Sequence, residues 1–365
     1  MKDLGFVAVM LAVELMDVIA NTISKAAMKK GMNDFVFVMY SNAFGTCFLF
    51  LITLIFYRKR TLPPLSYKII GLLFVVGFLS CSNQMLKFFG IDYSSPTLSS
   101  AMSDLIPAFT FILAIIFRME KLDWKTNSSW AKSIGTLVTI SGALIMSVYK
   151  GQAVINNDPS LKLFPRKLAS SMEFDWVFGA VLLAAHSFCL SINFIVLTRI
   201  VREYPSELVV MLIRTALASI LSVPAAMLSV KDLKALRLEF NMELIAIGLS
   251  AIFVLSFGSV IATWTIGKKG PVFVAMFTPL TILFAVILGI TFLGDSLYIG
   301  SVIGAIMVVI GFYAVIWGKT RENVEEDCTV YSIESYSTEV PVLLNTRMGN
   351  KASRTDIYSL LEGQE

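Results

Sequence analysis

Residues 95–122 read "SPTLSSAMSDLIPAFTFILAIIFRMEKL", and residues 270–297 read "GPVFVAMFTPLTILFAVILGITFLGDSL". The two stretches can be laid over each other without gaps. The matching positions are Pro96 with Pro271, Leu105 with Leu280, Ile115 with Ile290, Phe117 with Phe292, and Glu120 with Asp295. We therefore interpret the chain as an internal duplication.

Four glycines continue this correspondence into the apolar run that follows each stretch. Gly135 and Gly142 fall on Gly304 and Gly311, after a loop that is six residues shorter in the second copy. The two glycines of each copy are seven residues apart, so they lie on one face of a helix. Small residues on such a face permit close helix packing in a membrane, and we predict this structural role for all four.

The composition is that of a membrane protein. Of the 365 residues, 56% are hydrophobic and 15% are charged, with a mean hydropathy of +0.76, whereas soluble domains carry about 25% charged residues. Runs of about 17 to 25 mostly apolar residues can cross a bilayer as helices. Ten such runs are present, at 4–24, 35–57, 67–90, 97–118, 130–149, 175–198, 206–230, 243–265, 271–293 and 298–317. We predict an all-α integral membrane protein with ten transmembrane helices.

Each copy of the duplication contains five of these helices. Because five is odd, the second copy enters the membrane from the opposite side, which predicts inverted repeats. We expect a first repeat at 1–150, a linker loop at 151–174, a second repeat at 175–318 and a disordered tail at 319–365. Inverted repeats commonly hold a binding site at their interface near the middle of the membrane, opened to each side in turn by rocking of the halves.

The distribution of Lys and Arg predicts the orientation of the chain. With the N-terminus inside, the inner segments carry fifteen of these residues and the outer segments ten. Because cytoplasmic segments carry the excess of positive charge, we predict that both termini are cytoplasmic. The glycosylation sequon at Asn127 then faces the cytoplasm and stays unmodified.

The first apolar run contains three polar residues near its middle. Glu14, Asp17 and Asn21 are spaced i, i+3, i+7, so they share one stripe of a helix. A charged side chain at mid-bilayer costs about 2.5 to 3.5 kcal/mol on the mildest scale, so the stripe is expected to face a transport pathway. The alternative is that Asp17 and Asn21 snorkel or hold helices together.

Other apolar runs contribute further candidate residues for substrate binding or proton coupling. These are Asn83, Gln84, Lys87, Asp104, His186, Asn193 and Arg214. Structural alternatives are snorkelling of Lys87 or Arg214, an ion pair between Arg214 and an acid, and an interior hydrogen bond of His186, the only histidine. Together, buried acids and cations suit a zwitterion, whose ammonium would approach Glu14, Asp17 or Asp104 and whose carboxylate would approach Lys87 or Arg214.

Enzymatic and cofactor chemistry finds little support in the sequence. One histidine cannot supply a two-histidine metal motif, and neither a G-x-S-x-G motif nor a P-loop is present. The four cysteines are scattered and fit neither a disulfide framework nor a metal cluster. The net charge of +4 lies mostly between apolar runs, which argues against nucleic acid as a partner. We expect no enzyme activity, cofactor or metal.

Several local motifs resemble a known family. "NTISKAAMKKGM" (21–32), "GTLVTISGALIMSVYKG" (135–151), "KKGPVFVAMFTPL" (268–280) and "GSVIGAIMVVIGFYAVIWGK" (300–319) are similar to the plant walls-are-thin-related proteins, also called UMAMITs. These form part of the EamA branch of the drug/metabolite transporter superfamily. The resemblance implies the fold of that superfamily and a bidirectional carrier for amino acids or, in some members, auxin.

The polar tail raises a second functional hypothesis. It contains short patterns similar to acidic dileucine sorting signals, at 339–344 and 356–361. A regulatory scaffold acting through the tail is therefore the alternative to a transporter. Expected partners are an amino acid-like solute, the bilayer, a second copy of the chain in a homodimer, and sorting adaptors at the tail. The expected location is the plasma membrane or a vacuolar or other internal membrane.

Overall fold

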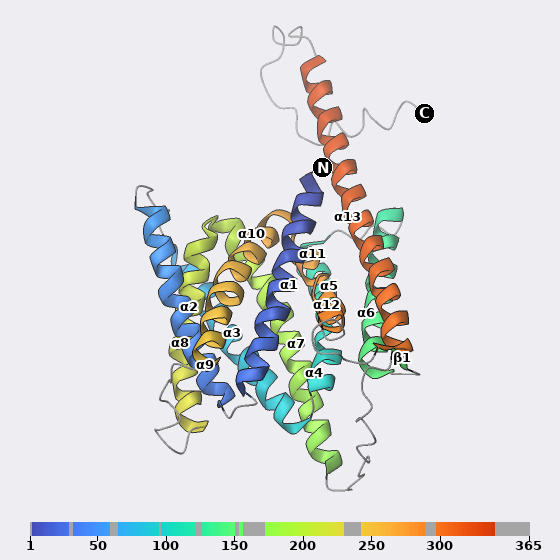
Figure 1. Ribbon diagram of the computed structural model, residues 1–365. Coiled ribbons are helices and arrows are strands. Elements are labelled where there is room, and N and C mark those ends of the chain that lie inside the picture. Colours follow the sequence, from blue (N-terminus) through green and yellow to red (C-terminus); the bar gives the residue numbers. More distant parts are fainter. Residues whose placement is uncertain are drawn as a thin grey trace. The chain divides into compact units, whose positions relative to one another are not determined.

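A computed structural model describes most of the chain as helix (Figure 1). The described residues are 2–28, 32–58, 65–94, 96–120, 126–149, 153–155, 172–229, 242–288 and 297–339. The chain divides into two units, Met1–Lys319 and Thr320–Glu365. The first unit contains all the residues discussed below as candidate site residues.

The described residues are almost all helical. In the first half they are α1 (Lys2–Met28), α2 (Asp34–Tyr57), α3 (Tyr67–Tyr93), α4 (Pro96–Ser103), α5 (Ile106–Ile116) and α6 (Asn127–Val148). In the second half they are α7 (Met172–Glu203), α8 (Glu207–Ser229), α9 (Met242–Leu249), the π-helix η2 (Ser250–Gly258), α10 (Ser259–Lys269), α11 (Pro271–Ala275), α12 (Leu280–Leu288) and α13 (Ile299–Glu339). Two short strands, β1 (Ala153–Ile155) and β2 (Leu297–Tyr298), pair antiparallel.

The predicted all-α membrane fold is confirmed. Within the described residues, eight helical stretches are long and apolar enough to cross a membrane, and α5 is a shorter apolar helix. The predicted span 97–118 is divided between α4 and α5, and the predicted span 130–149 corresponds to α6. Continuous α9, η2 and α10 make up the predicted span 243–265.

A helix break occurs at the same aligned position in both copies of the duplicated segment. Leu105 and Leu280 are aligned with each other, and the amide of each donates to a carbonyl three residues earlier, Met102 at 3.1 Å and Phe277 at 3.0 Å. Pro107 lies in the first turn of α5, the helix after the first break, and Pro279 lies in the second break. Since proline has no amide hydrogen to donate, a regular helix cannot continue unchanged through either position.

The predicted close packing of the four glycines is confirmed. A Cβ atom built on Gly135 would lie 2.8 Å from the carbonyl oxygen of Gly311, and one on Gly142 would lie 2.8 Å from that of Gly304. α6 and α13 therefore approach through pairs of glycines, one from each copy of the duplication. Side chains at these positions would collide with the backbone of the partner helix.

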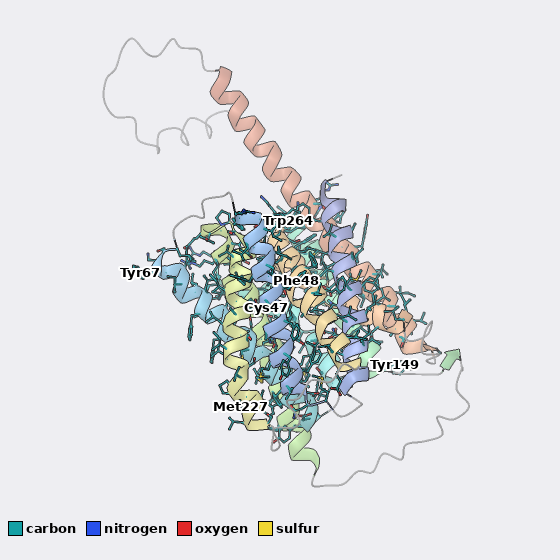
Figure 2. All side chains as sticks on the ribbon, turned by 60° about the vertical axis from the view of Figure 1, so that its left-hand side comes forward. Cys47, Phe48, Tyr67, Tyr149, Met227 and Trp264 are labelled. Atoms are coloured by element: carbon teal, nitrogen blue, oxygen red, sulfur yellow. The ribbon has the colours of Figure 1, made fainter. Side chains whose placement is uncertain are left out.

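The interior and the surface of the first unit are both largely apolar. Its main core gathers side chains from α3, α7, α8 and α10, among them Val76, Leu197 and Met211. Outward-facing apolar side chains are also numerous, and Tyr67 and Met227 are 93% and 58% exposed (Figure 2). Such a surface suits contact with lipid chains, because no water has to be ordered around it there.

The last helix, α13, extends beyond residue 319, where the sequence predicts that a disordered tail begins. The helix continues to Glu339. Between Gly318 and Pro341 the sequence contains neither glycine nor proline, the residues that most strongly disfavour a helix interior. Pro341 disfavours helical conformation in the residue before it. The described residues do not include 340–365, which contain most of the proposed sorting patterns. They also do not include 156–171, which make up most of the expected linker.

Candidate functional site

The acidic stripe of α1 forms as its spacing predicts. Glu14 and Asp17 are partly buried, and Asn21 is exposed in the isolated chain. The amide of Asn21 donates to Oδ2 of Asp17 at 2.8 Å, one helical turn away. Glu14 and Asp17 interact electrostatically as like charges. Asn21 therefore orients the carboxylate of Asp17, while Glu14 adds a second acid to the same face.

Lys87 brings positive charge to this stripe from a different helix. It lies on α3 and interacts electrostatically with Asp17 on α1 and with His186 on α7. α1 packs mainly on α9, η2, α10 and α12, whereas α3 packs on α7 and α8. The two groups of helices thus carry charges of opposite sign that interact electrostatically, Asp17 on α1 and Lys87 on α3. Within the described part of the chain, Lys87 forms no ion pair shorter than 4.0 Å.

His186 joins α7 to α3. Its side chain is 5% exposed, and Nδ1 lies 3.0 Å from the backbone oxygen of Asn83, which accepts a hydrogen bond when the ring carries its proton on Nδ1. This contact matches the structural alternative for His186. The side-chain oxygen of Asn83 is buried and has no hydrogen-bond partner among the described residues.

Gln84 connects α3 to α2. Its Oε1 accepts a hydrogen bond from Nδ2 of Asn42 at 2.8 Å, and the same amide of Asn42 donates to the backbone oxygen of Val38. Oδ1 of Asn42 has no partner among the described residues, although Asn42 is 1% exposed. A buried acceptor without a donor is costly, so Asn42 and Asn83 are both suited to bind a solute or water that donates hydrogen bonds.

A second polar cluster joins α3, α7 and α8. Ser80 accepts hydrogen bonds from Nε of Arg214 at 2.7 Å and from Nδ2 of Asn193 at 2.9 Å. It donates its own hydrogen to the backbone oxygen of Val76 at 2.7 Å. Nη1 of Arg214 also approaches the sulfur of Met211 at 3.5 Å. Asn193 and Arg214, two of the predicted residues, thus meet at a serine that the sequence did not single out.

Arg214 lacks the ion pair that one structural alternative assigned to it. No acid lies within 4.0 Å of its guanidinium among the described residues, which include Glu14, Asp17 and Asp104. Its polar contacts there are the neutral groups of Ser80 and Met211. The charge is therefore held by neutral groups, and it can attract an anion from outside the protein.

The helix break between α4 and α5 is anchored to α7. The hydroxyls of Ser187 and Ser191 donate to the backbone oxygens of Met102 at 2.7 Å and Ile106 at 3.1 Å. Both carbonyls flank the break, where helical hydrogen bonds are lost. Asp104 lies in the break itself, and only 1% of the residue is exposed. This predicted site residue is therefore a buried acid between α4 and α5.

A separate cluster of charged residues lies just after α5. The carboxylate of Glu120 pairs with Lys132 of α6 at 3.2 Å and with Lys319 of α13. Its side chain is 2% exposed and that of Lys132 is 1% exposed. This cluster ties α13 to the segment after α5, and it takes no part in the two polar clusters above. Among the described residues, no group of three or more His, Cys, Asp or Glu side chains is arranged to hold a metal ion.

The predicted residues therefore lie at two levels along α3 and α7. Asn83, Gln84, Lys87, His186 and the α1 stripe belong to one level, and Asn193 and Arg214 belong to the other, where Ser80 joins them. Sequence analysis missed Ser80 and Asn42, whose importance depends on contacts with other helices. The spacing of Ser80, Gln84 and Lys87 along one face of α3 was the available signal.

Known proteins similar to this chain were found by sequence and by fold. The profile of the EamA-like transporter family matches twice, at residues 5–148 and 177–317. One WAT1-related protein of Arabidopsis thaliana is 42% identical over 327 residues, covering 88% of both chains. Another is 40% identical over 348 residues, covering 94% of this chain and 96% of the relative. A solved structure with 13% identity covers 85% of this chain and 96% of its own at a TM-score of 0.64, which supports the fold alone.

Proposed function

Since this chain belongs to the EamA-like transporter family, we propose that it carries amino acids or related small organic solutes, with auxin as a further candidate. Membership makes the chain a multi-pass membrane transporter rather than an enzyme. Two observations support the proposed solutes: the polar residues inside the helices and the resemblance to the family. The proposed mechanism is secondary-active or facilitative transport by alternating access between inverted repeats.

The observation that carries the proposed solute is the charge of Arg214, which has no acid within 4.0 Å among the described residues. An arginine among membrane-spanning helices is costly unless a partner compensates it. Its described contacts are neutral, so a solute carboxylate is a fitting partner, and guanidinium groups bind carboxylates strongly through paired hydrogen bonds. Glu14 and Asp17 supply negative charge for an ammonium group. Both charge signs are thus present for a zwitterion.

The matching helix breaks support alternating access. They fall at aligned positions of the two copies, and interrupted helices leave backbone groups that can bind a solute or ion within the membrane. Each break lies between two rigid helical pieces, which allows one piece to tilt relative to the other. Inverted repeats that contain such breaks can exchange conformations between the two sides.

Orientation and location form part of the proposal. We place both termini in the cytoplasm, following the excess of Lys and Arg in the segments on that side, and the protein in the plasma membrane or a vacuolar membrane. Asn127 is exposed at the start of α6, so its sequon tests the orientation. A glycan found on Asn127 in intact cells would contradict the proposed topology.

The function is tested by counterflow in proteoliposomes. Purified full-length protein would be reconstituted into vesicles, and the vesicles would be loaded with an unlabelled amino acid. Uptake of the same compound in labelled form would then be followed with and without a pH gradient. A panel of amino acids and indole-3-acetate covers the proposed solutes, and protein-free vesicles provide the control. We expect saturable uptake accelerated by the internal solute. Non-saturable uptake would indicate a channel, and no uptake by folded protein would contradict the proposed solutes.

A scaffold that acts through its tail is the second candidate function. Deleting residues 323–365 separates the two because this segment lies beyond the unit that contains the polar clusters. If the protein is a carrier, counterflow persists after the deletion. If it is a scaffold, the deletion abolishes its effect in cells.

A further inference from the structure

Ser80 occupies the centre of the polar cluster around Arg214. It is 3% exposed, and its hydroxyl uses its one hydrogen and both acceptor sites, toward Val76, Asn193 and Arg214. A hydroxyl with every site occupied cannot rotate without breaking one of these bonds. The position of Nε of Arg214 is therefore determined by a group that is itself held in place by α3.

This arrangement leaves one edge of the guanidinium available. Nε is bound to Ser80, so a carboxylate cannot bind the edge that combines Nε with a terminal nitrogen. The edge formed by the two terminal nitrogens remains, and its only polar contact among the described residues is with the weak acceptor sulfur of Met211, 3.5 Å from Nη1. A carboxylate can replace that contact with two charge-assisted hydrogen bonds.

The cluster around Ser80 and Arg214 lies at a different position along α3 from Lys87. Ser80 and Lys87 are seven residues apart, which corresponds to about 10 Å along a helix. On α7, His186 and Asn193 show the same separation, and they contact α3 at Asn83 and at Ser80 respectively. Lys87 interacts electrostatically with Asp17 and His186, which belong to the other group of polar residues. Arg214 and Lys87 thus serve different levels of the molecule.

We infer that Ser80 is a positioning residue for an anion subsite in which the terminal nitrogens of Arg214 bind the carboxylate of the solute. The inference rests on the proposed transport of carboxylate-bearing solutes. It assigns the carboxylate to Arg214 rather than Lys87, and it gives Ser80 and Asn193 the role of holding the guanidinium. Selectivity for an acid over the corresponding amide is the expected consequence.

The first test compares acids with their uncharged amides in counterflow. The probes are indole-3-acetate with indole-3-acetamide, and phenylalanine with phenylalaninamide. Ser80→Ala is expected to raise the KM of the acids about tenfold and that of the amides by no more than about twofold, with kcat little changed, because one orienting hydrogen bond to a charged group is lost. Ser80→Thr, which keeps the hydroxyl, should restore the acid preference.

Ser222→Ala provides the matched control. Ser222 is fully buried on α8, the helix of Arg214, and its hydroxyl bonds to the backbone oxygen of Ser219 at 2.8 Å. We expect this variant to behave as the wild type. Equal changes of KM for acid and amide in Ser80→Ala, or an equal effect of Ser222→Ala, would reduce Ser80 to a packing residue and overturn the inference.

A second test does not depend on transport. The melting temperature of the purified full-length protein would be measured with increasing benzoate, and with benzamide for comparison. We expect benzoate to raise it in the wild type and in Ser222→Ala, less in Ser80→Ala, and not in Arg214→Gln. If Arg214→Gln does not fold, the Ser80 variants decide. A benzoate shift without counterflow would reject the proposed solutes but support the subsite, whereas equal shifts in all variants, or none, would reject the subsite.

Discussion

Charged residues inside the helices differ in how they are compensated. Asp17 has the amide of Asn21 and the charge of Lys87 nearby, whereas Arg214 is held by a serine hydroxyl. Both residues could be selected from the sequence, because a charge in an apolar run is conspicuous and costly. The pairing of each with its neighbour could not, since Lys87 and Ser80 are distant from Asp17 and Arg214 in sequence and are brought near by helix packing.

The acidic stripe leads to a prediction about single charges. Asp17→Asn removes the charge that interacts with Lys87 but keeps an oxygen able to accept the hydrogen bond of Asn21. Asn21→Ala removes that hydrogen bond and keeps the charge. If charge is what the transport cycle uses, Asp17→Asn should reduce the initial rate of counterflow about tenfold, the effect of roughly 1.4 kcal/mol, and Asn21→Ala should reduce it much less. Glu14→Gln should also reduce it.

Protein amount and folding would be checked by size-exclusion chromatography and thermal unfolding of each variant. Unchanged flux and pH dependence in both Glu14→Gln and Asp17→Asn would remove the stripe from the mechanism. A larger loss in Asn21→Ala than in Asp17→Asn would instead identify the hydrogen bond as the important feature.

At the scale of elements, apolar runs predicted the helices, but their internal breaks required structure. The run at 97–118 satisfies the length of a membrane span, yet it forms α4 and α5 with a break near Pro107. The same limitation applies to the π-helix η2, whose residues form an unremarkable apolar run. A proline or a hydrophobic pattern allows a break or bulge, but packing against neighbouring helices decides whether it forms.

The glycine contact between α6 and α13 gives a prediction at this scale. A Cβ on Gly311 would lie 2.6 Å from both the backbone oxygen of Gly135 and the backbone nitrogen of Thr139. Gly311→Ala should therefore lower the free energy of unfolding by about 1 to 3 kcal/mol, the usual cost of overpacking. Denaturant or thermal unfolding in detergent measures this change.

Gly71→Ala is the control, because a Cβ there has no neighbour within 4 Å. It should leave the stability unchanged or raise it slightly, since alanine favours helix over glycine. Similar stability of both variants would show that α6 and α13 do not depend on this close approach.

At the scale of the whole molecule, both halves of the sequence lie within one unit that ends at Lys319. Glu120 contributes to this union, because it binds Lys132 from its own half and Lys319 from the other. A buried carboxylate shared by two lysines is much more sensitive to the loss of one partner than an exposed ion pair is. The duplication itself stays a prediction from the alignment of the two stretches.

Glu120→Gln should consequently destabilise the first unit. It leaves two cations without their shared buried acid, and such a loss typically costs about 3 to 5 kcal/mol. Glu203→Gln is the matched control, since Glu203 pairs with Arg199 at 3.6 Å with both side chains largely exposed, and its loss should cost about 0.5 kcal/mol or less. Thermal unfolding of the two variants measures the contrast, and equal small changes would argue against a stabilising role for Glu120.

The sequence by itself determined the membrane fold, the approximate helices, the facing glycines and the choice of Glu14, Asp17 and Arg214 as candidates. These features depend on local composition and spacing, which set how a segment meets lipid and which side chains share a helix face. Only the tertiary structure decided where the helices break, that α13 extends to Glu339, and that Ser80 holds Arg214 while Lys87 interacts electrostatically with Asp17. Those outcomes arise from contacts between segments far apart in the chain, whose free energy depends on the packing of several helices together.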